Sequence, residues 1–122
     1  MSFLVVVLAA ACGAAARYLL DYYIVSRTDG AIPWGTFTVN VSGSFALGVL
    51  LGLVVFRGVP AEYEIVFGTG FLGAYTTFST WLYEVVRLLE QGRVRAGVWN
   101  VLGSWAAGTA AAAVGLWIAW VA

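Results

Sequence analysis

The sequence has 122 residues, of which 62% are hydrophobic and only 10% charged, with a formal net charge of zero. Soluble domains are about 45–50% apolar and about 25% charged, so this composition indicates a membrane protein and excludes a soluble enzyme. The absence of histidine and the single cysteine leave no parts for His–Cys metal sites or histidine bases, so we expect no enzyme. Six scattered arginines form no basic patch, which excludes nucleic acid as a partner.

Charged residues and the two prolines divide the chain into four apolar stretches. A membrane-spanning helix needs about 20 apolar residues, and the stretches are close to that length. We therefore predict an all-α, multi-pass protein of the cell membrane, with one domain over residues 1–122 and lipid around it. The four transmembrane helices are expected at about 3–20, 34–56, 65–86 and 98–121.

The second and fourth stretches carry polar and small residues at every fourth position, which places them on one face of each helix. The two series are Thr36, Asn40, Ser44, Gly48 and Gly52, and Asn100, Ser104, Gly108 and Ala112. Such residues commonly hold membrane helices together, which is the simplest interpretation of a single Ser or Thr. Two asparagines at bilayer depth favour a polar pathway, because hydrocarbon cannot satisfy their donors and acceptors.

The third stretch is rich in glycine and hydroxyl groups. Four hydroxyl side chains lie among the six residues from Thr76 to Trp81, preceded by glycines. We expect this helix to be broken, with unwound backbone from Gly73 to Thr76 whose carbonyl oxygens suit a hard cation. Phe78 and Trp81 are three residues apart and can present their positive ring edges on one face, although ordinary aromatic packing is the alternative.

Arg17 lies inside the first apolar stretch, where an arginine must face water or a partner. Two interpretations stay open. It can form a surface pair with Asp21, one turn further on, or its charge can concentrate anions at the mouth of a pore.

Three segments resemble the CrcB/Fluc family of fluoride channels, and the resemblance extends along essentially the whole chain. They are Gly13–Tyr18, Gly35–Phe45 and Gly73–Thr80. The resemblance implies an antiparallel dimer of four-helix subunits, two narrow pores that export fluoride passively, and a central structural sodium ion.

The resemblance also implies roles for particular residues. Asn40 is similar to the pore amide, which we expect to donate to the ion rather than to a neighbouring helix. Phe78 is similar to the first of two aromatic residues that face fluoride, and Trp81 stands where the family usually has the second, a phenylalanine. Backbone carbonyls of Gly73 and Thr76 would bind sodium, and Arg17 would guard the vestibule. The pore lining would further include Thr36, Ser79, Thr80, Asn100 and Ser104.

Two other classes of protein are alternatives. A small multidrug-type, proton-coupled exporter is also a four-span chain of this length, but it needs a titratable acid deep in the first helix, where this sequence has Arg17 and no acid before Asp21. A pore-free accessory subunit would use the polar stripes only to pack a partner. Fluoride efflux from reconstituted vesicles separates all three.

The arginines are distributed unequally between the two ends of the predicted helices. With four spans, five arginines fall on the side of the first and third loops, and only Arg57 falls on the side of the termini. The positive-inside rule then predicts one orientation, with both termini outside, and an antiparallel dimer would need an oppositely oriented paralogue. A homodimer of dual topology remains the alternative, because Arg17 can be engaged in a vestibule.

Overall fold

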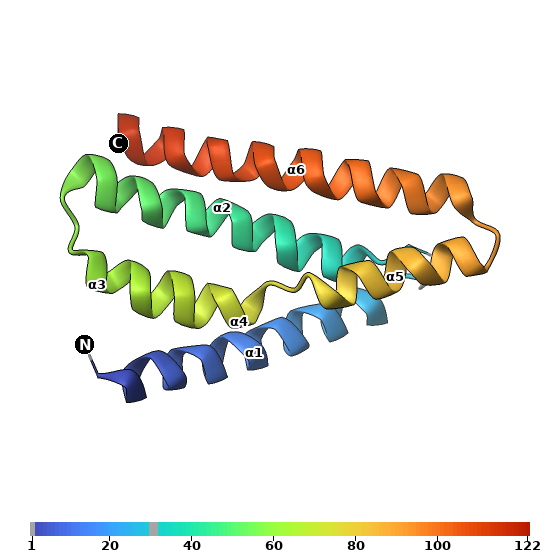
Figure 1. Cartoon of the computed structure of the whole chain (residues 1–122), viewed down its shortest axis with the longest axis horizontal. Helices are drawn as coiled ribbons and strands as arrows, with labels where there is room; N and C mark the ends of the chain where they lie inside the picture. The colour runs from blue at the N-terminus through green and yellow to red at the C-terminus, as the bar shows by residue number, and fades with distance from the viewer. Residues whose placement is uncertain (1, 30–31) are drawn as a thin grey trace.

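The computed structural model describes residues 2–29 and 32–122, and within these residues the regular structure is entirely helical (Figure 1). Three helices are long and apolar enough to cross a membrane: α1 (Phe3–Ser26), α2 (Trp34–Arg57) and α6 (Val94–Val121). The helix α1 continues six residues beyond the predicted end, and α6 begins four residues earlier than predicted.

The third apolar stretch is divided into four shorter elements, so three candidate spans are found in the described residues rather than four. These elements are α3 (Ala61–Tyr63), the π-helix η1 (Glu64–Leu72), α4 (Gly73–Tyr75) and α5 (Ser79–Glu90). The non-helical residues are 76–78, beginning at Thr76, whose φ of −82° and ψ of 159° are extended. The prediction that the unwound backbone starts at Gly73 is therefore wrong, because Gly73–Tyr75 are helical.

The helices α2 and α6 pack along their length through small residues (Figure 1). A Cβ at Gly48 would overlap the carbonyl oxygen of Ala112, and a Cβ at Gly115 would overlap that of Phe45. The stripe of small residues expected from the sequence is therefore a helix–helix contact at this depth. On the other side of the molecule, α1 packs against η1 and α4 in the same way, with Gly13 against the backbone of Phe71.

Both described chain ends lie at one end of the bundle, together with the connection between α2 and α3, while the connection between α5 and α6 lies at the other end (Figure 1). At the end that holds the chain termini, Arg57 links α2 to the last turn of α6. Its Nε donates to Ala119 O at 3.0 Å and its Nη2 to Trp120 O at 3.2 Å. These bonds satisfy carbonyls that the last turn of α6 would otherwise leave unpaired.

The buried core is small for a chain this apolar. Val39 of α2 is the only large side chain that is fully buried among the described residues. Large hydrophobic side chains are exposed on every long helix, including Leu8, Leu51 and Trp105. A soluble monomer rarely exposes apolar area on this scale, so the outer surface is suited to lipid or to another membrane subunit.

Candidate functional site

A cavity of about 540 Å³ lies beside the non-helical residues 76–78, between α2, the third stretch and α6. We call it the polar cavity. It brings together side chains from both polar stripes and from the third stretch, and none of the described residues that line it is charged. The polar and aromatic lining residues are Asn40, Ser44, Thr76, Thr77, Phe78, Trp81, Ser104, Trp105 and Thr109.

Asn40 connects α2 to the non-helical segment. Its Nδ2 donates to Thr77 O at 2.8 Å, and Thr77 N donates to its Oδ1 at 2.8 Å, so the side-chain amide pairs with both groups of one residue's backbone. The amide therefore donates to a neighbouring non-helical segment, a bond that the sequence did not indicate. An asparagine amide carries two hydrogens, and Thr77 uses one, so one donor is left for a ligand.

Close approach of α2 to this segment depends on Gly43, which the sequence analysis did not single out. A Cβ at this position would overlap the Thr76 side chain, and Tyr75 lies next to it. The Tyr75 hydroxyl is also 2.8 Å from the Ser42 hydroxyl, which links α4 to α2. In the sequence, Gly43 is a glycine between two serines, which is a weak signal by itself. Its role becomes clear only from the packing of α2 against Tyr75 and Thr76.

Interruption of the helix changes the partners of two backbone carbonyls. In a continuous helix, Thr77 N would donate to Gly73 O and Thr80 N would donate to Thr76 O. Here Thr77 N donates to Asn40 Oδ1, and Thr80 N donates to Thr77 Oγ1 at 3.2 Å. The carbonyls of Gly73 and Thr76 thus lose their helical donors to side chains. Among the described residues, no group of three or more acidic, histidine or cysteine side chains could hold a metal ion, which leaves the neutral oxygens of carbonyl, amide and hydroxyl groups as candidates.

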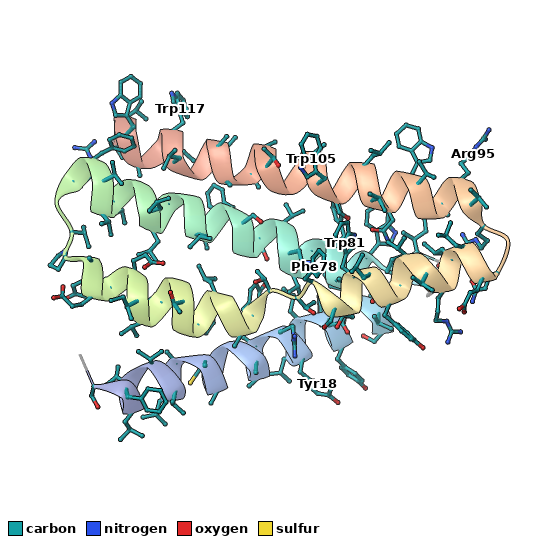
Figure 2. All side chains as sticks on the ribbon, viewed as in Figure 1. Tyr18, Phe78, Trp81, Arg95, Trp105 and Trp117 are labelled. Atoms are coloured by element: carbon teal, nitrogen blue, oxygen red, sulfur yellow. The ribbon has the colours of Figure 1, made fainter. Side chains whose placement is uncertain are left out.

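Phe78 and Trp81 face each other across one turn at the start of α5. Their ring centroids are 5.6 Å apart with the planes tilted by 58°, and both rings lie between the third stretch and α6 (Figure 2). Phe78 is 68% exposed, so it fills no core position. Trp81 is held differently, because its Nε1 donates to Asn100 Oδ1 at 2.8 Å.

Asn100 is the meeting point of α5 and α6. Besides the Trp81 indole, the Ser104 hydroxyl donates to the same Oδ1 at 3.0 Å. Asn100 does not line the polar cavity but a second, more apolar one of about 670 Å³, which we call the arginine-end cavity because Arg93 and Arg95 line it. Ser104 lines both cavities and so marks the place where they adjoin. The four-residue spacing placed Ser104 on the same face as Asn100, but nothing in the sequence indicated the bond from Trp81.

Thr36 lies away from both cavities, although its sequence position places it in the same stripe as Asn40. It is 4% exposed, and its hydroxyl donates to Glu84 Oε1 at 2.7 Å. The other oxygen, Glu84 Oε2, is buried without a hydrogen-bond partner in the described part of the chain. Ser79 is exposed at the start of α5 and lines none of the described cavities.

Arg17 lines a third, smaller cavity of about 200 Å³, together with Asp21, Thr36, Thr77 and Thr80. Within residues 2–29 and 32–122, Arg17 and Asp21 form no ion pair, which removes the surface pair as an explanation of the arginine. Asp21 instead packs on α2, where a Cβ at Gly35 would overlap its carboxylate. Arg17 therefore lines a cavity to which the non-helical segment also contributes, through Thr77.

Comparison with known proteins gives a consistent result. Residues 4–116 match the family described as CrcB-like protein, Camphor Resistance (CrcB). The chain is 48% identical to the fluoride-specific ion channel FluC 1 of Symbiobacterium thermophilum, and the alignment covers 98% of both proteins. It is 44% identical to FluC 1 of Leifsonia xyli, over 94% of this chain and 84% of that protein. It is 41% identical to FluC 2 of Mycobacterium tuberculosis, over 93% of this chain and 87% of that protein.

Proposed function

The chain belongs to the CrcB family, and from this premise we propose that it is a fluoride-specific ion channel of the cell membrane, not an enzyme. It carries fluoride out of the cell passively, down the gradient of the ion. The long apolar helices α1, α2 and α6 make it a multi-pass membrane protein.

The observation that carries the proposal is the polar cavity, whose donors are neutral. A small anion gives up tightly bound water on entering a pore, so the pore must supply hydrogen-bond donors in its place. The free Nδ2 hydrogen of Asn40 and the hydroxyl of Ser44 can do so, and the positive edge of the Phe78 ring adds a weaker attraction. Because the lining side chains that the structure describes are uncharged, the anion meets no fixed cation among them that would trap it.

We further propose that two such chains pair in antiparallel orientation. Polar groups at bilayer depth must be shielded from lipid, and the exposed Phe78 ring beside the polar cavity is a surface that a second subunit can cover. Four arginines lie beyond or near the ends of α1 and α5, against Arg57 alone at the other end. This bias favours one orientation for each chain, and hence a paralogous partner.

A sodium ion between the subunits is part of the proposal. The Gly73 and Thr76 carbonyls, whose helical donors are diverted to Asn40 Oδ1 and Thr77 Oγ1 respectively, have the chemistry that a hard cation requires. When bound, the ion would hold the non-helical segments together. The Asn40–Thr77 pair fixes this segment from the side of α2.

The direct test is ion efflux from vesicles that contain the purified protein. Vesicles loaded with fluoride should release it rapidly, and vesicles loaded with chloride should retain it, with protein-free vesicles as the control. Equal release of the two anions, or no release of fluoride, would contradict the proposal. Reporters for each compartment fused to the C-terminus then separate the two kinds of dimer: equal signals indicate a homodimer of dual topology, and an external signal alone indicates a paralogous partner.

A further inference from the structure

The Glu64 carboxylate lies at the edge of the polar cavity. Glu64 is the first residue of η1, directly after α3, and it is half-buried. Its side chain folds along the helix towards Gly68, because a Cβ at Gly68 would lie 2.6 Å from Glu64 Oε1. Gly68 is buried and lines the polar cavity, so the missing Cβ leaves room for a carboxylate beside that cavity. We call the region beside Glu64 and Gly68 the chain-end mouth.

Within residues 2–29 and 32–122, no protein group neutralises this carboxylate. Glu64 forms no ion pair there and accepts no hydrogen bond on its side chain. Arg57 is the nearest arginine along the chain, and it donates instead to the carbonyls of Ala119 and Trp120. The Glu64 oxygens are not among the buried polar atoms that lack a partner, so water and ions can reach them.

The two ends of the bundle differ in charge. The charged side chains described at the end that holds α3 and both described chain ends are Arg57, Glu62 and Glu64 (Figure 1). At the other end, Arg93 and Arg95 line the arginine-end cavity, to which the described chain contributes no acidic residue. Charge at the mouth of a channel changes the local concentration of ions, so an anion is favoured at the arginine end and disfavoured at the chain-end mouth.

We propose that Glu64 is an electrostatic barrier at the chain-end mouth, where its charge lowers the local concentration of fluoride and limits the rate at which the ion passes. Glu64 does not line the polar cavity itself, so it binds no fluoride and acts only through its charge. This inference rests on the proposed function, because the ion that it names is fluoride.

Glu64→Gln keeps the size of the side chain and removes its charge. In vesicles at an ionic strength of about 0.1 M, set with potassium gluconate, we expect fluoride efflux to rise about threefold. At about 1 M the Debye length shrinks to about 3 Å, so the difference from the unchanged protein should nearly vanish. Glu62→Gln is the matched control, because Glu62 is exposed on α3 and water already screens it, and it should change efflux by less than about 1.5-fold.

The dependence on salt separates charge from packing. If Glu64→Gln is no faster than the Glu62→Gln control at the lower ionic strength, or if its gain persists at the higher one, the inference is overturned. Failure of the unchanged protein to release fluoride would instead overturn the proposed function.

A chemical test changes the charge after the protein has folded. Glu64→Cys, combined with Cys12→Ala to remove the native thiol, is reconstituted and then modified with two methanethiosulfonate reagents of similar size. The reagent that ends in a sulfonate should restore the slow efflux of the unchanged protein, and the reagent that ends in trimethylammonium should make efflux faster than in the unmodified variant. Cys12→Ala alone, treated in the same way, is the control. Equal effects of the two adducts would show obstruction rather than charge and would overturn the inference.

Discussion

Asn40 and Asn100 are the same residue type in equivalent stripes of two helices, yet the structure uses them in opposite ways. Asn40 uses its oxygen and one amide hydrogen to bond the backbone of Thr77. It therefore fixes the non-helical segment and retains one free donor. Asn100 uses only its oxygen, which accepts hydrogen bonds from Trp81 and Ser104, and it retains two amide hydrogens as donors. A buried amide is therefore not a fixed chemical unit, because its partners decide how many of its hydrogens remain for a ligand.

Replacing Asn40 should have the largest effect, because this amide has both roles. We expect Asn40→Leu to abolish fluoride efflux and to lower the free energy of unfolding by about 2 kcal/mol, since two hydrogen bonds to Thr77 are lost. Efflux and thermal unfolding in detergent measure the two effects. Asn40→Asp, which keeps the acceptor for Thr77 N, should recover part of the stability but not the efflux. Near-normal efflux from Asn40→Leu would show that the polar cavity is not the pathway.

Phe78→Ile tests the cavity that Asn40 lines without touching the Asn40–Thr77 pair. Because the ring is largely exposed in one chain, we expect little loss of subunit stability but a fall in efflux of at least about tenfold, as the ring edge is removed. Phe67→Ile, on the exposed side of η1 beside Tyr63, is the control and should conduct normally. Equal efflux from the two variants would remove the aromatic ring from the mechanism.

Removal of sodium sharpens the difference between the two asparagines, because only Asn40 is bonded to the segment that carries Gly73 and Thr76. With N-methylglucamine in place of sodium, we expect dimer stability or efflux to fall severalfold, as measured by cross-linking and by the vesicle assay. Assembly and transport that do not depend on sodium would contradict a cation at these carbonyls.

Thr36→Val should have the smallest effect on conduction, because Thr36 donates to Glu84 and lines neither the polar cavity nor the arginine-end cavity. We expect a loss of stability of about 1 kcal/mol and a change in efflux of less than about twofold. Thermal unfolding and the vesicle assay measure these. A loss of efflux as large as that of Phe78→Ile would place Thr36 on the pathway and extend the stripe from Asn40 towards the small cavity beside Arg17.

Much of the architecture was predictable because apolar length and four-residue spacing are local properties of a chain. The spans α1, α2 and α6 follow from uninterrupted hydrophobic residues, and the helical period places Gly48 on the face that meets α6. The interruption near Thr76 was also signalled by glycines and hydroxyls, but the expected residues 73–76 share only Thr76 with the observed non-helical residues 76–78. Helix propensity alone does not locate such a break, since the bond from Asn40 on another helix decides which peptide is released.

The sequence by itself determined that this is a helical membrane protein of the CrcB family, because composition, hydropathy and the order of motifs do not depend on how the side chains pack. Only the tertiary structure decided which polar groups are available. Thr36 and Asn40 share one helical face, yet Glu84 takes the hydroxyl of the first and Thr77 takes half of the amide of the second. Trp81 and Asn100 are 19 positions apart, and the bond that joins them exists because α5 and α6 bring a donor-only indole against an amide oxygen. The bonds of Thr36, Asn40 and Trp81 join different elements of the fold, so no pattern within one helix can assign them.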